Sequence, residues 1–211
     1  MRLKRYFLVF LLFSVLITNS WATIVQRMIE EKYSAVIRPF SSKWYVGTLF
    51  IENTKLKIKY ESDFSKYPTI MAYKISEDKI DIIIKSLPFD NVPKNNEVFS
   101  PTYYLITLFI ENNSVNYVCY FIENPYLIID GFTFNYGKIN EENVNVRTKP
   151  TTQSTIYSKL NFGANITVTS IGNDLIKIAK MLDFWLEIEI DNKKFWIYGY
   201  YIEFLKEIIL K

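Results

Sequence analysis

Short runs rich in β-branched and aromatic residues follow one another along most of this chain, and this pattern restricts its fold more than any other feature. The runs are Lys43–Ile51, Lys55–Tyr60, Thr69–Ile75, Lys79–Lys85, Thr102–Glu111 and Val115–Glu123, with further apolar runs around Gly131. Short polar segments such as Glu52–Asn53 separate them and are typical of turns. Strands joined by short turns favour antiparallel pairing. We therefore predict an all-β fold, in which residues 23–138 form an antiparallel β-meander closed as a barrel or a sandwich.

The first 22 residues have the three-part pattern of a secretory signal. A basic head, Met1–Arg5, precedes an uncharged apolar run from Tyr6 to Thr18. The small residues Ser20 and Ala22 then occupy the positions that a signal peptidase reads. The apolar run is shorter than the roughly 20 residues of a membrane-spanning helix. We therefore predict a signal peptide over residues 1–22, export to the periplasm or the outside, and no membrane span after cleavage.

The charge of the exported chain argues against a nucleic-acid partner. The whole sequence has 25 basic and 22 acidic residues, and the predicted signal contains Arg2, Lys4 and Arg5 but no acidic residue. Subtracting these three leaves 22 basic against 22 acidic residues, so the exported chain is formally neutral. Its basic residues are scattered, whereas a nucleic-acid-binding domain carries a basic patch.

The chain contains no histidine and one cysteine, and this composition excludes several kinds of catalytic site. Ser-His-Asp and Cys-His mechanisms and the usual zinc sites all require histidine. Cys119 lies in an apolar strand-like run, whereas a reactive thiol needs exposure and a positive neighbourhood. We therefore predict a buried structural thiol at Cys119, and we expect neither a metal nor a cofactor.

A polar segment, Asn140–Asn143, divides the chain into two parts of balanced charge. Residues 23–138 contain 13 basic and 13 acidic residues, and residues 139–211 contain 9 of each. We predict one domain in each part, the second of which begins at residue 139.

Strand patterns in the second part predict a small closed β-barrel. Val144 and Val146 alternate with polar residues, so that one face of their strand enters a core. Leu186 and Ile188 alternate with Trp185 and glutamates in the same way. Pro150 ends the first strand pairing because it has no backbone N–H group.

This part of the chain resembles the bacterial SH3 (SH3b) domain family over about residues 140–204. The matching residues are Asn145, Val146, Arg147, Pro150, Ile156, Leu160, Gly163, Ile166 and Val168, followed by Trp185–Ile188 and Phe195–Glu203. The resemblance implies an SH3-like barrel. Phe195 departs from it, since the family usually has glycine before its closing tryptophan, and Thr148 and Lys149 replace small loop residues. The segment Gly172–Phe184 is longer than the family's turn, and we expect an extra strand or a helical turn there.

Four residues of the predicted barrel are candidates for ligand binding: Trp185, Trp196, Tyr198 and Arg147. The three aromatic residues share the face opposite to the core, and such rings can form a groove for a peptide or a glycan. The alternative is that they cover the barrel or pack against the first part, because a small domain has little core of its own. Arg147 can grip a carboxylate, although we expect it to pair with a glutamate, Glu187 or Glu189.

The family resemblance implies a function in binding rather than in catalysis. SH3b domains commonly serve as non-catalytic modules of exported proteins, so we expect a binding or scaffolding protein of the bacterial cell envelope, whose partner is a cell-wall peptide or an envelope protein. Two alternatives stay open for residues 23–138. One is a barrel that holds an apolar ligand, and the other is a wall hydrolase with two carboxylates. The available carboxylates are Glu30, Glu31, Asp63, Asp81 and Asp90, and no spacing selects a pair among them.

Overall fold

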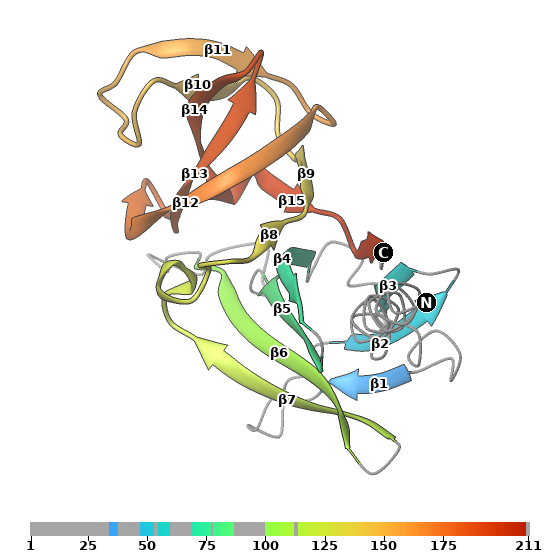
Figure 1. The fold of residues 1–211 in the computed structure, drawn as a ribbon. Coiled ribbons are helices and arrows are strands. Elements are labelled where there is room, and N and C mark those ends of the chain that lie inside the picture. The colour runs from blue at the N-terminus through green and yellow to red at the C-terminus, as the bar shows by residue number, and fades with distance from the viewer. Residues whose placement is uncertain are drawn as a thin grey trace, which may run out of the picture.

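The structure is a computed structural model that describes residues 34–37, 47–52, 55–59, 69–76, 78–86, 100–111 and 114–209 (Figure 1). The predicted signal peptide lies outside these ranges. Within them, no helical segment has the length and hydropathy needed to span a membrane. All strand pairs are antiparallel, and the strands form three sheets, so the all-β prediction is confirmed.

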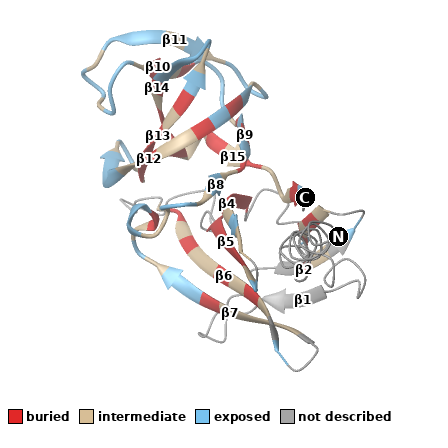
Figure 2. Cartoon of the chain, in the orientation of Figure 1, coloured by how far each residue is buried: buried red, intermediate tan, exposed pale blue. Residues whose placement is uncertain are grey.

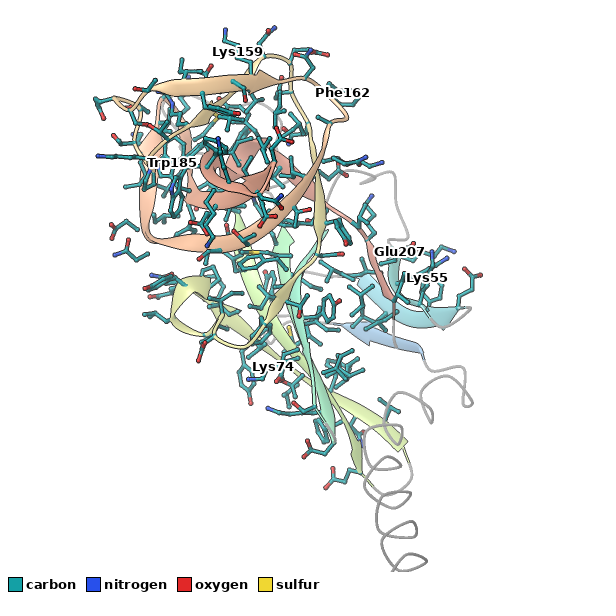
Figure 3. The ribbon with its side chains drawn as sticks, turned by 45° about the horizontal axis from the view of Figure 1, so that its top comes forward. Lys55, Lys74, Lys159, Phe162, Trp185 and Glu207 are labelled. Carbon is teal, nitrogen blue, oxygen red and sulfur yellow. The ribbon has the colours of Figure 1, made fainter. Side chains whose placement is uncertain are left out.

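The first sheet combines strands from the two ends of the described chain. Its order is β1-β2-β3-β16, with β1 at Ser34–Ile37, β2 at Gly47–Glu52, β3 at Lys55–Lys59 and β16 at Glu207–Ile209. Lys55 and Glu207 form an ion pair of 2.6 Å across the pairing of β3 with β16 (Figure 3). The last strand of the chain therefore lies beside the early strands.

The second sheet is an antiparallel meander with one later strand added. Its order is β7-β6-β5-β4-β8, with β4 at Thr69–Ile75, β5 at Lys79–Ser86, β6 at Thr102–Glu111, β7 at Ser114–Ile122 and β8 at Thr133–Phe134. The predicted runs from residue 69 to residue 123 thus correspond to four consecutive strands. The predicted apolar run that follows them differs, because Pro125–Leu127 forms a 3-10 turn, η1, capped by the Asn124 side chain. Proline fixes its own φ and has no N–H group to offer a sheet, which favours this turn.

Both faces of the second sheet are covered, which explains the nearly continuous apolar sequence of β5. Ile80, Ile82 and Ile84 face the first sheet and share a core with Leu49 and Leu56. Ile83 and other residues of the opposite face pack against the C-terminal barrel instead. Figure 2 shows the resulting line of buried positions along β4 and β5. The described strands of the first and second sheets therefore enclose a common core, and residues 205 and 206 link the two sheets by accepting backbone hydrogen bonds from Ile70 and Ile58.

The third sheet curls into the predicted SH3-like barrel. Its order is β11-β10-β14-β13-β12-β9-β15, with β9 at Tyr136–Ile139, β10 at Val144–Arg147, β11 at Ile156–Leu160, β12 at Asn165–Ile178, β13 at Met181–Ile190, β14 at Lys193–Tyr198 and β15 at Ile202–Phe204. A 3-10 turn, η2 at Gly199–Tyr201, connects β14 to β15. Val144, Val146, Leu186 and Ile188 are buried as the alternation predicts.

Turn residues explain how the barrel strands reverse. Asp191 and Asn192 have φ values of 51° and 58°, as a two-residue hairpin of type I′ requires. Gly163 has a φ of 82°, which glycine adopts without steric cost. The long segment after Gly172 continues β12 and β13 into an extended hairpin, which supplies the expected extra strand structure.

Strand pairing crosses the predicted domain boundary at residue 139. β9 begins at Tyr136 and pairs with β12 and β15 of the third sheet. β16 lies beyond the barrel and pairs with β3. The division of the chain into 23–138 and 139–211 stays a prediction.

Candidate binding site in the C-terminal barrel

The candidate aromatic residues lie on the outer face of β13 and β14. Trp185 is directly opposite Tyr198 in the strand register, and their ring centroids are 5.6 Å apart in an edge-to-face arrangement. Trp196 is opposite Glu187 on the same face. Their strand neighbours Phe195 and Ile197 point into the core. The predicted alternation of the two strands is therefore confirmed.

Burial on this face decreases along β13 away from the N-terminal sheets. Asp183 is 1% and Trp185 is 4% exposed, Glu187 is half-buried and Glu189 is exposed. The ring of Trp185 therefore has almost no contact with solvent. Its indole Nε1 is buried and has no hydrogen-bond partner among the described residues.

An irregularity in β12 contributes to the burial of Trp185. Ile171 pairs with Leu186 and Leu175 pairs with Phe184, so three residues of β12 face the single residue Trp185. Gly172 is the first of these three, and a Cβ atom there would lie 3.3 Å from the carbonyl oxygen of Trp185 and 3.8 Å from the ring of Trp196. The backbone of β12 thus passes close to both tryptophans.

Tyr198 links the two strands of the extended hairpin by hydrogen bonds. Its hydroxyl lies 2.7 Å from the carbonyl oxygen of Ile176 and 3.0 Å from that of Met181, on the two strands of the hairpin. Burial raises the pKa of Tyr198, and the negative charge of Asp183 raises it further. Tyr198 therefore stays protonated and donates to these carbonyls, and its ring is not available to a ligand in this conformation.

Trp196 is the candidate tryptophan that keeps partial exposure. It lies between Arg147 on β10 and Glu187 on β13 in the strand register. A basic, an aromatic and an acidic side chain thus follow one another across three strands of the outer face. This row combines an apolar surface with groups of both charges.

The prediction that Arg147 pairs with Glu187 or Glu189 is wrong. Its Nη1 donates to the carbonyl oxygen of Ser154 at 2.7 Å, which closes the loop between β10 and β11. Glu187 accepts from Lys194 at 2.7 Å and from the hydroxyl of Thr169 at 3.0 Å. The carboxylate of Glu187 is thus bound by residues of β12 and β14, the two strands that pair with its own strand β13, whereas Arg147 lies one strand further away on β10.

Two further tyrosines, Tyr200 and Tyr201 of η2, extend the aromatic surface. The ring of Tyr201 is 6.0 Å from that of Tyr198 and 5.8 Å from that of Tyr200. Both tyrosines are half-buried, and burial, followed by the charge of Glu141, raises the pKa of Tyr201. The sequence analysis does not select them as candidates, although they lie within the matched segment Phe195–Glu203. We call Trp185, Trp196, Tyr198, Tyr200 and Tyr201 the aromatic cluster.

A buried ion pair connects the inner end of the aromatic cluster to the second sheet. Lys85 on β5 donates from Nζ to Asp183 Oδ2 and to the carbonyl oxygen of Gly199, both at 2.7 Å. Asp183 Oδ1 accepts from the Tyr103 hydroxyl at 2.7 Å and from the Phe184 N–H at 2.8 Å. The exposures of the Lys85 and Asp183 side chains are 3% and 1%. Burial, followed by the charge of Asp183, raises the pKa of Tyr103 well above its usual value.

The sequence contained a weak signal for this ion pair. Lys85 ends an apolar strand, and Asp183 follows two apolar residues in "MLDF", so both charges lie where apolar neighbours predict burial. The two residues are 98 positions apart, and local patterns do not identify such a partner.

Of the residues that could act in catalysis, the structure describes Cys119 and Asp81. Cys119 is buried, and burial raises the pKa of its thiol to about 11, which confirms the predicted structural thiol. Asp81 accepts from Thr107 at 2.6 Å and pairs with Lys79 at 3.1 Å. The other four candidate carboxylates, Glu30, Glu31, Asp63 and Asp90, lie outside the described residues.

Comparison with known proteins identifies the C-terminal barrel. Residues 142–203 match the family model of the bacterial SH3 domain. The match runs from two residues before β10 to the middle of β15 and includes the whole aromatic cluster. No curated protein and no solved structure matches the chain.

Proposed function

We propose that this protein is an exported, non-catalytic binding or scaffolding protein of the bacterial cell envelope. The observation that carries the proposal is the bacterial SH3 domain at residues 142–203, a type of domain that typically binds peptides or proteins. The three-part pattern of residues 1–22 supports export. A cell-wall peptide or an envelope protein is the proposed partner.

The proposed contact surface is the exposed end of the aromatic cluster together with Arg147. Trp196, Tyr200 and Tyr201 are half-buried, so each residue keeps some surface accessible to solvent. Arg147 neighbours Trp196 across the strands, and its guanidinium has further N–H groups besides the one that binds Ser154. An aromatic surface beside a guanidinium suits a peptide that carries a carboxylate.

We assign Trp185 and Tyr198 a supporting role within this surface. Both are buried, and Tyr198 binds two carbonyl groups of the extended hairpin. They fix the backbone on which Trp196 and η2 are placed. Of the four candidates named from sequence, Trp196 and Arg147 are therefore the proposed ligand contacts.

The N-terminal sheets are proposed to act as a platform for the SH3 domain. The buried Lys85–Asp183 pair and the hydrogen bond from Tyr103 join the second sheet to β13. Apolar side chains of the first and second sheets fill the space between them, which favours a platform over a barrel that carries an apolar ligand.

Retention on purified peptidoglycan tests the proposal. We expect the processed full chain to sediment with the wall material, and Trp196→Ala or Arg147→Gln to weaken retention about tenfold or more, as is typical of a central contact. Phe162→Ala is the matched control, because Phe162 is 68% exposed and lies away from Trp185 on the barrel (Figure 3). Thermal melting of each variant separates lost contacts from lost folding. A folded protein that neither sediments with the wall nor recovers an envelope protein would contradict the proposal.

A further inference from the structure

Hydrogen-bonding groups without partners gather around the aromatic cluster. Among the described residues, three buried side-chain nitrogen or oxygen atoms have no hydrogen-bond partner: Asn140 Oδ1, Asn145 Oδ1 and Trp185 Nε1. Such atoms are rare in native proteins, because a buried polar atom without a partner lowers stability. All three belong to the barrel and its entry from β9, so this surface contains hydrogen-bonding capacity that the fold itself does not use.

Asn145 lies beside the two proposed ligand contacts. It alternates with two buried valines of β10, so its side chain points to the outer face, as that of Arg147 does. Arg147 pairs with Trp196 in the antiparallel register. Two residues further along both strands, Asn145 is therefore level with Tyr198. Asn145 is half-buried, so a rotation of its side chain can turn the amide group toward a ligand.

Asn140 adds a second acceptor at the other end of the aromatic cluster. Its backbone N–H donates to the carbonyl oxygen of Tyr201 at 3.1 Å, and its Nδ2 donates to that of Tyr200 at 3.2 Å. These bonds hold Asn140 against η2 and leave its Oδ1 without a donor. Asn140 is half-buried, whereas Trp185 is 4% exposed, so the two asparagines are the members of this group that a ligand can approach.

We propose that Asn145 determines specificity by pairing with a backbone amide of an extended peptide, and that Asn140 Oδ1 accepts from another N–H group of the same peptide. The proposal rests on the proposed function, in which Arg147 binds a carboxylate of the ligand. An asparagine side chain has both a donor and an acceptor, as a peptide group has, so the two can form two hydrogen bonds with each other.

The spacing of Arg147 and Asn145 fits such a peptide. The two residues are two positions apart on β10, which corresponds to about 7 Å along a strand. Two residues of an extended peptide span the same length. A peptide whose terminal carboxylate binds Arg147 can therefore place a preceding backbone amide at Asn145.

Asn145→Leu separates a ligand contact from a structural residue. Leucine has a similar size and no polar side-chain atom, so the free protein loses only an oxygen that has no partner in the fold. We expect the urea midpoint of the processed full chain to be unchanged or higher, and its retention on purified peptidoglycan to be weaker by about tenfold or more. A soluble peptide released from peptidoglycan should displace the parent chain from the wall material.

Asn165→Leu is the matched control. Asn165 lies opposite Lys138 on a neighbouring strand, just as Asn145 lies opposite Lys159. It is on β12, which is three strands away from β10 in the order of the sheet. This variant should therefore keep the retention of the parent chain.

Three results would overturn the proposal. Unchanged retention of Asn145→Leu would show that Asn145 does not contact the ligand, and a lower urea midpoint would show that its side chain is structural. Failure of the soluble peptide to displace the parent chain would show that another wall component is bound. Weaker retention of Trp196→Ala without any effect of Asn145→Leu would contradict the role of Asn145 alone, whereas a parent chain that is not retained would contradict the proposed wall binding as well.

Discussion

Breaking the buried Lys85–Asp183 pair should destabilise the protein strongly and unequally, depending on which partner is changed. Asp183→Asn leaves the Lys85 ammonium buried with the Gly199 carbonyl as its acceptor. Lys85→Met leaves the Asp183 carboxylate with the Tyr103 hydroxyl and the Phe184 N–H as donors. Removing one partner of a buried pair typically costs about 3–5 kcal/mol. We expect Asp183→Asn near the upper end of this range and Lys85→Met near the lower end.

The double variant Lys85→Met/Asp183→Asn provides the decisive comparison. It contains neither charge, so its loss of unfolding free energy should be smaller than the sum of the losses of the two single variants by about 2 kcal/mol, within the range found for contacting residues.

Tyr103→Phe is a milder probe of the same network, because it removes one hydrogen bond to the carboxylate and keeps the ring. Its expected cost is about 1.5–3 kcal/mol, the usual value for a hydrogen bond to a charged group.

Urea unfolding followed by both tryptophan fluorescence and far-UV circular dichroism measures these free energies. Coincident transitions in the two signals support the two-state treatment. Losses of less than about 1 kcal/mol in both single variants, or losses that add in the double variant, would contradict a stabilising contact between Lys85 and Asp183.

Three further predictions concern single residues. Gly199→Ala should lower the free energy of unfolding in urea by about 1–3 kcal/mol, because the added Cβ would lie 2.8 Å from the carbonyl oxygen of Phe184. The Cβ of Gly163→Ala would meet no atom within 4 Å, so this variant should lose less stability, and only because alanine disfavours the positive φ of this position. Tyr198→Phe should lose about 1 kcal/mol and increase tryptic cleavage after Lys180 in the turn of the extended hairpin, and an unchanged cleavage rate would contradict the role given to its hydroxyl. Cys119 should react slowly with a thiol reagent at neutral pH and rapidly in denaturant, because burial raises the pKa of its thiol to about 11. Fast reaction of the native protein would contradict the burial of Cys119.

The sequence predicted those features that depend on local periodicity. Val144, Val146, Leu186 and Ile188 are buried because side chains alternate between the faces of a strand, and this alternation is visible without a structure. The Asp191–Asn192 turn was predictable for a similar reason, since both residue types tolerate the positive φ of a type I′ hairpin.

Features that depend on distant segments were not predictable. The burial of Trp185 results from three residues of β12 that face one residue of β13, and no local pattern indicates this irregularity. The hydroxyl of Tyr103 lies 80 positions from its acceptor Asp183, and sequence spacing does not single out such a partner. The pairing of β16 with β3 joins segments about 150 residues apart, for which loop closure gives no preferred partner.

Hydrogen exchange in the presence of a soluble wall peptide locates the contact surface on the SH3 domain. We expect a peptide released from purified peptidoglycan to slow exchange in β14 and η2, around Trp196 and Tyr200, and in the loop that Arg147 closes. The N-terminal sheets should exchange at the same rate with and without the peptide. Slower exchange confined to the N-terminal sheets, with β14 and η2 unchanged, would contradict a wall-peptide site on the SH3 domain.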